Sequence, residues 1–282
     1  MSRAEADEKI VAQEESGRGA GAPLQVTREP GSGWVATARD IGLSFGLLLA
    51  VWWVVASLAS PLFLPSPTRV AEAFVRLTQD GSLATALWMT LIPLFAGLIA
   101  SCLLGAFAGL IMGLVPPLDK ITGPWVYVFW STPIVAILPI LILLFGVGTV
   151  SASVFVFLSS VFPVIMNARS GAQQTDKGMI EVARSLGARR REILWHVVLP
   201  SSVPPILSGF RIAVGRAVVS VIVAQLFISA EGIGYMIRFY SDTLQLDLYF
   251  APLLLTVAIG VLLNGLADIG ERRLVRWEAH DG

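Results

Sequence analysis

Few residues in this chain of 282 could carry out chemistry, and none has the spacing that a known catalytic motif requires. The lysines, histidines and cysteine are Lys9, Lys120, Lys177, His196, His280 and Cys102. No lysine stands in the Gly-Lys-Ser/Thr sequence that cradles nucleotide phosphates, and the histidines do not form the H-E-x-x-H pair of zinc proteases. A lone cysteine excludes an internal disulfide and a cysteine-based zinc site. We therefore expect no enzyme, metal site or cofactor, and the net charge of zero provides no overall basic excess for nucleic acid.

One polar segment, residues 176–200, has a spacing that suits contact with another protein. It reads DKGMIEVARSLGARRREILWHVVLP. Asp176 is suited to begin a helix, because an acid there complements the helix dipole, and Gly187 is suited to end it in the left-handed conformation. Residues 188–198 predict a second helix, which we expect Leu199 and Pro200 to stop. The segment therefore predicts a helix, a corner and a helix, although a solvated basic loop that only enforces topology is the alternative.

Long stretches without charge predict the elements that must position this segment. Hydrophobic residues make up 55% of the chain and charged residues 14%, which nearly excludes a soluble globular protein. A bilayer core needs about 20 apolar residues per helix. The pattern predicts an all-α integral membrane protein with six transmembrane helices within a domain at 39–277. The expected helices are at about 41–60, 88–114, 123–145, 151–168, 204–228 and 249–269.

The two ends of the chain and the basic residues predict its orientation. Residues 1–38 are rich in acids and small residues and predict a disordered cytoplasmic tail, and residues 278–282 predict a second, short tail. Lys and Arg collect in the cytoplasmic segments of membrane proteins. With the N-terminus inside, fifteen of the twenty Lys and Arg residues fall on the inner side. Both termini and the 176–200 loop are therefore expected in the cytoplasm.

The spacing within the 176–200 loop resembles that of a known family. Glu181, Ala183, Gly187 and Leu199-Pro200 stand as E-x-A-x3-G-x11-L-P. This pattern resembles the "EAA" loop of binding-protein-dependent ABC transporter permeases, with Val182 in place of its second alanine. Flanking blocks, among them PIVAILPILILLFGVG at 133–148, resemble the nitrate, sulfonate and taurine branch of that family.

This resemblance implies a type I ABC importer permease fold and a set of partners. It implies a multi-pass subunit of the bacterial cytoplasmic (inner) membrane, two copies of a separate ATPase subunit and an extracytoplasmic solute-binding protein. A second copy of the permease is expected, most simply as a homodimer. The coupling to the ATPase would fall on Glu181, Val182, Ala183, Gly187, Leu199 and Pro200. The solute would be small and often anionic, such as nitrate, a sulfonate or an aromatic carboxylate, with thiamine-precursor heterocycles as an alternative.

Polar residues inside the predicted spans are candidates for a translocation path. They are Ser131, Thr132, Gln225 and Asn264. Such groups tend to face the interior of a bundle, although isolated hydroxyls more often bond to a neighbouring backbone. Arg211 and Arg216 either reach toward the membrane surface or attract an anionic solute. Two alternative functions remain: an ion-coupled secondary transporter, which the charge-free spans disfavour, and a membrane scaffold without transport activity.

Overall fold

The computed structural model describes residues 34–59 and 63–274, and these residues are helical apart from short connections. The chain divides into two compact units, residues 1–52 and 53–282. The helix α2 (Trp34–Leu58) begins in the first unit, and its residues Gly42–Leu58 form an apolar segment. The helix therefore starts before the predicted residue 41, and residues 34–38, which were predicted to belong to the tail, are helical. The rest of that tail and the 278–282 tail lie outside the described residues.

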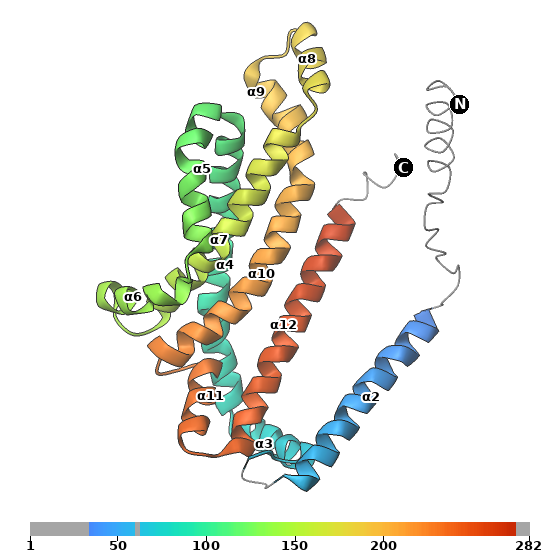
Figure 1. The fold of residues 1–282 in the computed structure, drawn as a ribbon, viewed down its shortest axis with the longest axis vertical. Helices are drawn as coiled ribbons and strands as arrows, with labels where there is room; N and C mark the ends of the chain where they lie inside the picture. The colour runs from blue at the N-terminus through green and yellow to red at the C-terminus, as the bar shows by residue number, and fades with distance from the viewer. Residues whose placement is uncertain (1–33, 60–62, 275–282) are drawn as a thin grey trace, which may run out of the picture. The chain divides into compact units, whose positions relative to one another are not determined.

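The second unit is a succession of helices (Figure 1). In chain order they are α3 (Pro67–Gln79), α4 (Ser82–Leu114), α5 (Pro116–Ser131), the 3-10 turn η1 (Ile134–Ile137), α6 (Leu138–Phe145), α7 (Thr149–Gln174), α8 (Lys177–Ser185), α9 (Arg190–Ile193), the π-helical turn η2 (Leu194–Val198), α10 (Leu199–Ile228), α11 (Ile233–Asp242) and α12 (Leu246–Leu274). Gly146 and Gly148, both with positive φ, make the turn between α6 and α7.

Four helices in the described part of the chain are long and apolar enough to cross a bilayer: α4, α7, α12 and the continuous helix from Arg190 to Ile228. A fifth span is possible if α5 and the η1–α6 segment count together, but these two are bent by 92°. The prediction of one unbroken helix at 123–145 is therefore wrong. The break falls at Thr132, whose ψ of 135° is extended, because the following Pro133 disfavours a helical conformation in the residue before it.

The core of the second unit is built on close contact between α4 and α7. The side of α4 that faces α7 carries small residues at every fourth position, which we call the small-residue stripe. Its members are Gly97, Ser101, Gly105, Gly109 and Gly113. A Cβ atom added at Gly97 would lie 2.6 Å from the Ser153 carbonyl oxygen, and one at Gly113 would lie 2.6 Å from the Ala172 Cβ. The stripe therefore lets the two backbones approach more closely than side chains would allow.

On its other side α7 packs against α10. Gly209 of α10 contacts Asn167, where an added Cβ would lie 2.8 Å from the Asn167 Cβ. Val156 and Val164 of α7 join Ala213, Ala217 and Val221 of α10 in one buried cluster. The helices α4, α7 and α10 therefore form the packed centre of this unit.

Two arginines inside the helices, Arg169 and Arg211, are paired with carboxylates of neighbouring helices. Arg169 of α7 forms an ion pair with Asp119 of α5, and the Asp119 carboxylate also accepts from the Gln173 side chain at 3.0 Å. Arg211 of α10 contacts Asp268 of α12 at 2.6 Å and Glu271 at 3.6 Å. Because charges in a low-dielectric setting are costly unless paired, these contacts tie α5 to α7 and α10 to α12.

We predict that Gly109→Val lowers the stability of the purified protein, because the new side chain must displace the α7 backbone. An added Cβ at Gly109 would already lie 2.7 Å from the Ala168 Cβ, and overpacking of this kind costs about 1–3 kcal/mol. Gly265→Val is the matched control, since a Cβ there meets no atom within 4 Å. Thermal unfolding in detergent measures both variants, and equal midpoints would contradict the close approach.

Candidate functional site

The first half of the 176–200 loop is the short helix α8, which begins as predicted. The Asp176 side chain accepts a hydrogen bond from the Gly178 N–H at 2.8 Å and so caps the helix. A capping aspartate satisfies one of the free N–H groups at a helix start and complements the helix dipole. Asp176 therefore fixes where α8 leaves the end of α7.

The corner after α8 is made by Gly187, whose φ is +82°. The Gly187 N–H donates to the Arg184 carbonyl at 2.9 Å, and the Ala188 N–H donates to the Ala183 carbonyl at 3.0 Å. This pair of bonds is the Schellman arrangement, which needs a left-handed residue at the corner. A Cβ on Gly187 would meet nothing within 4 Å, so the backbone conformation and not the space requires glycine here.

The second half of the 176–200 loop leads directly into α10. The Arg189 N–H donates to the Glu192 carboxylate at 2.6 Å at the start of α9, and the helix then continues through η2 into α10. The expectation that Leu199 and Pro200 stop this helix is wrong. Pro200 lies in the first turn of α10, and the wider π turn just before it accommodates a residue that has no N–H to donate.

The inner side of the loop packs on the ends of α4 and α7. Ile193 and Val198 form a buried cluster with Ala172 of α7, and Ala183 and Ala188 pack against it from the corner. Ala183 therefore lies where a small residue lets the corner contact the bundle. Leu199 is half-buried, whereas Pro200 is exposed.

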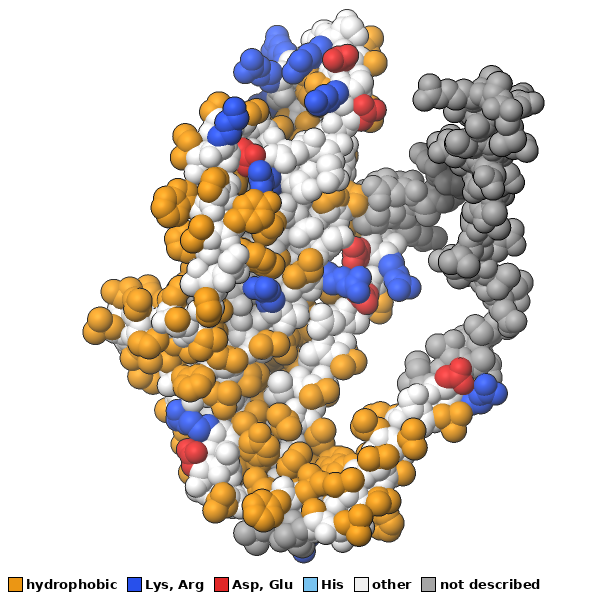
Figure 2. All heavy atoms as spheres, in the orientation of Figure 1, with side chains coloured by type: hydrophobic (Ala, Val, Ile, Leu, Met, Phe, Trp, Pro, Cys, Tyr) orange, Lys and Arg blue, Asp and Glu red, His pale blue; other side chains and the backbone are white. Residues whose placement is uncertain are grey.

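The outer side of α8 combines an apolar stripe with charge. The exposed fractions of Met179, Val182 and Leu186 are 53%, 59% and 82%, and this i, i+3, i+7 spacing places them on one face of the helix. We call these three residues the α8 apolar stripe. Glu181 is also exposed, and basic side chains gather around α8 and α9 (Figure 2). No cluster of His, Cys, Asp or Glu in the described residues could hold a metal ion. The exposed apolar stripe beside charged side chains suits docking of a partner.

The four residues predicted for a translocation path occupy different settings. Ser131 and Thr132 are exposed at the break between α5 and η1. Asn264 of α12 donates to the Gly260 carbonyl of its own helix at 2.7 Å, and its side-chain oxygen faces Gly215 of α10. The structure brings Asn264 next to α10 but does not gather the four residues in one place.

Gln225, the fourth residue predicted for the translocation path, is 1% exposed. Its side-chain amide forms hydrogen bonds inside the bundle. Its oxygen accepts from the Thr90 hydroxyl at 2.9 Å and from the Gly234 N–H at 3.1 Å, and its nitrogen donates to the Met89 carbonyl at 3.2 Å. Thr90 in turn accepts from the Ile233 N–H at 2.9 Å. Gln225 thus ties α4, α10 and the start of α11 together in this conformation.

Sequence reasoning did not single out Thr90. The Gly232-Ile233-Gly234 sequence, in which two glycines flank one residue, signals a tightly packed start of α11 but does not point to Thr90. Added Cβ atoms at either glycine would lie within 3 Å of the Gln225 side chain, so this pattern indicates a close approach to a side chain.

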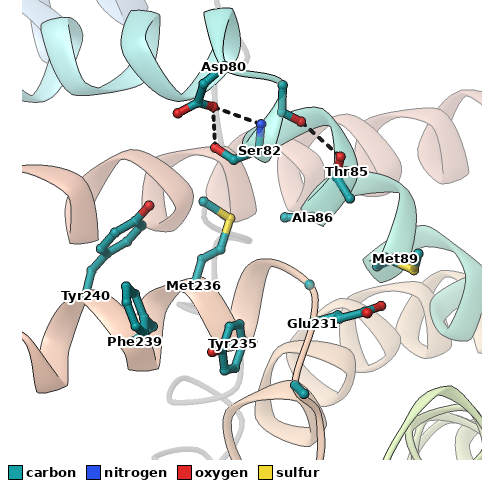
Figure 3. Close-up of a pocket in the computed structure, with 13 residues that line it drawn as sticks. Asp80, Ser82, Thr85, Ala86, Met89, Glu231, Tyr235, Met236, Phe239 and Tyr240 are labelled. Carbon is teal, nitrogen blue, oxygen red and sulfur yellow. Dashed lines mark hydrogen bonds between the residues drawn. The ribbon is translucent and has the colours of Figure 1, made fainter.

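A cavity of about 500 Å³, which we call the α4–α11 cavity, lies at the end of α10 remote from the 176–200 loop, between the start of α4 and α11. Tyr235, Phe239 and Tyr240 of α11 face Ser82 and Met89 of α4 across it (Figure 3). Asp80 accepts from the Ser82 hydroxyl at 2.6 Å and the Ser82 N–H at 2.9 Å, and these bonds lower the pKa of Asp80. Burial, and secondarily the charge of Asp80, raises the pKa of Tyr240. The α4–α11 cavity is therefore lined by an anionic carboxylate, Asp80, and a neutral phenol, Tyr240.

Known proteins match this chain over most of its length. Residues 101–276 match the family described as binding-protein-dependent transport system inner membrane component. The chain is 34% identical over 251 residues to the taurine transport system permease protein TauC of Escherichia coli, covering 85% of this chain and 91% of the relative. It is 29% identical over 233 residues to a Bacillus subtilis permease protein, SsuC, assigned provisionally to aliphatic sulfonates, covering 82% and 84%. A chain of the inward-facing MetNI methionine ABC transporter superimposes with a TM-score of 0.61 at 19% identity, over 70% of this chain and 98% of its own length.

We predict that Gly187→Val loosens the corner of the 176–200 loop, whereas Gly187→Asn keeps it. A left-handed conformation costs an ordinary residue about 1–2 kcal/mol, and asparagine tolerates it better. The Ala188 amide should therefore exchange its hydrogen roughly 5–30 times faster in the valine variant. Hydrogen exchange with mass spectrometry measures this rate. Equal protection in the valine variant and the unchanged protein would contradict the role of φ at Gly187.

Proposed function

Because the chain belongs to the family of binding-protein-dependent transport system inner membrane components, we propose that it moves a small organosulfonate, such as taurine, as the permease subunit of an ATP-binding-cassette importer. The protein is a subunit of the inner membrane, and ATP hydrolysis belongs to a separate subunit. Support for the solute comes from the two relatives named for taurine and aliphatic sulfonates. A binding protein would deliver the solute to the outer face.

The observation that carries the coupling role is the geometry of the 176–200 loop. The α8 apolar stripe is exposed beside Glu181, and this suits a helix that docks in a groove of the ATPase subunit. The same loop continues without a break into α10. A displacement of α8 would therefore act on a spanning helix directly, through the half-buried Leu199 and the first-turn Pro200.

The proposed topology has six spans with both termini in the cytoplasm. Four spans would be α4, α7, the Arg190–Ile228 helix and α12, the fifth would be the bent α5–α6 segment, and the sixth would be α2. The distribution of Lys and Arg supports the orientation, since fifteen of twenty then lie inside. The α4–α11 cavity would then open on the outer face, where a binding protein docks.

We propose two copies of this chain and two ATPase subunits in the complex. A single chain presents one 176–200 loop, and a symmetric pair would present two equivalent docking helices to a pair of ATPases. Ser131, Thr132 and Asn264 remain candidates for the path between the two copies, and Gln225 would join them only if its bonds to Thr90 and Gly234 open.

We predict ATP-dependent uptake of taurine by the permease reconstituted in liposomes with its ATPase and its binding protein. Labelled taurine should accumulate only when ATP is on the side of the ATPase subunit and the binding protein is on the other side. The matched measurement replaces ATP by a proton or sodium gradient. Uptake that follows the ion gradient and ignores ATP would contradict the importer and favour a secondary transporter.

We further predict that Val182→Glu breaks the coupling between the ATPase and transport. The substitution puts an unpaired carboxylate in the middle of the α8 apolar stripe, and burying such a group against a partner costs at least about 1–3 kcal/mol. Uptake and stimulation of the ATPase by loaded binding protein should fall together by about tenfold or more. Lys177→Glu adds a carboxylate at an exposed position on the opposite side of the same helix, so it is the control and should retain both. An unchanged Val182→Glu complex would show that the stripe is not the docking face.

A further inference from the structure

Arg216 is a charged residue deep in a spanning helix without a carboxylate partner among the described residues. It lies twelve residues before Ile228, the last residue of α10, or about 18 Å along the helix axis. With the end of α10 at the edge of a hydrocarbon layer about 30 Å thick, this distance places Arg216 near the middle of the layer. Reaching the membrane surface with the side chain suits arginines near helix ends, and Arg216 is too far from either end of α10 for this.

Arg211, five residues earlier on the same helix, shows how the fold neutralises an arginine that only supports structure. Its guanidinium contacts Asp268 at 2.6 Å and Glu271 at 3.6 Å. Arg216 instead lies over the ring of Trp130, with 3.9 Å between the guanidinium carbon and the ring centroid. A cation–π contact holds the guanidinium by its face. The N–H groups at its edge are left to bind a planar or tetrahedral anion.

A cavity of about 470 Å³ lies beside Arg216, between one face of α10, α7 and the η1 turn. The α10 residues that line it recur at helical spacing, and the full lining is Ile134, Val135, Phe155, Ser159, Ile212, Gly215, Arg216, Val219, Ser220 and Val223. The cavity therefore combines one positive charge with mostly apolar walls. It also lies next to the break after Thr132, where the third predicted span bends.

Two hydroxyl groups complete the polar side of this cavity. The Ser220 hydroxyl donates to the Ser159 oxygen at 2.6 Å, and both residues are buried. Within the described part of the chain no acceptor is found for the Ser159 hydroxyl hydrogen, so it is available to donate. A buried hydroxyl pair with one free donor beside a guanidinium is suited to oxygen atoms of an anion.

We propose that Arg216, with the Ser159–Ser220 pair, forms a transient binding site for the sulfonate group of the solute on its way through the membrane. The inference rests on the proposed function for the identity of the solute and goes beyond it by assigning the site. The sulfonate accepts from the guanidinium edge and from Ser159, while its short alkyl part contacts Ile212, Val219 and Phe155. Trp130 holds the guanidinium in place when the site is empty.

The experiment uses a sulfonate-bearing thiol reagent, so that it does not depend on which solute the complex transports. Val219 lines the cavity and is 64% exposed, and V219C is introduced into a C102A background, because Cys102 is the chain's single cysteine. The complex is treated with 2-sulfonatoethyl methanethiosulfonate or with its trimethylammonium analogue. In both reactions the introduced thiolate forms a disulfide and releases methanesulfinate, so the reagents differ in the charge they bring to the site.

The anionic reagent should react faster than the cationic one, and R216Q should lower this preference at least about tenfold, while R216K retains most of it. The matched control is R211Q/E271Q, which removes an arginine and a carboxylate together, so the net charge stays the same and the preference should persist. S159A should lower the preference to a smaller extent. An unchanged preference in R216Q, or no reaction with either reagent, would overturn the site.

A second measurement separates this site from the proposed function. In liposomes, R216Q should reduce taurine uptake at least about tenfold while loaded binding protein still stimulates the ATPase, because the 176–200 loop is intact. Parallel loss of stimulation and of thermal stability in R216Q would assign Arg216 a structural role and overturn the proposal. Absence of taurine uptake in the unchanged complex would overturn the proposed solute and leave the reagent test to decide the anion site.

Discussion

Close backbone contact of α7 with α4 on one side and α10 on the other is the constraint on which the rest of this structure depends. In a bilayer, lipid tails are as apolar as leucine, so helices associate by close packing and by polar contacts rather than by hydrophobic burial. The small-residue stripe of α4 supplies the packing on one side of α7, and Gly209 supplies it on the other. These three helices position the 176–200 loop, the cavity beside Arg216 and the α4–α11 cavity.

Because α10 belongs to this packed centre, it connects features that lie far apart. The 176–200 loop runs into its first turn, the Arg211 ion pairs join its first half to α12, and Arg216 faces the cavity further along. Gln225 lies near its end and bonds to Thr90 and to the start of α11. A helix of 30 residues is about 45 Å long. One element therefore spans the distance between the 176–200 loop and the α4–α11 cavity.

The sequence allowed prediction of features that depend on local chemistry. Asp176 and Gly187 act through their own backbone and its nearest bonds, so the helix, corner and start of the second helix followed from residue type. The spans α4, α7, α10 and α12 followed from apolar length. The break at Thr132 was not foreseen, because Pro133 is compatible with a kink or with a full interruption, and the packing around η1 decides between them. Pro200 was predicted to end a helix, but the helix continues through it, because the π turn before it accommodates the proline.

Features that depend on contacts between distant segments could not be read from the sequence in the same way. Gln225 and Thr90 are 135 positions apart, and nothing local to either residue indicates the partner. The different settings of Arg211 and Arg216 could not be predicted either, because both residues are arginines on the same helix, α10. Only the arrangement of α12 and of Trp130 shows that one charge is neutralised and the other is not.

The Gln225 network also limits how the two ends of the bundle can move. Its hydrogen bonds with Thr90 and Gly234 are buried in a low-dielectric setting, where an unmade bond leaves a costly unsatisfied group. Arg238 of α11 adds a further tie, since it donates to the Leu226 carbonyl at 2.8 Å near the end of α10. These hydrogen bonds therefore fix the start of α11 to the end of α10. A shift of α10 driven from the 176–200 loop would carry with it the wall of the α4–α11 cavity formed by Tyr235 and Met236, so this cavity and the 176–200 loop would respond to the same displacement.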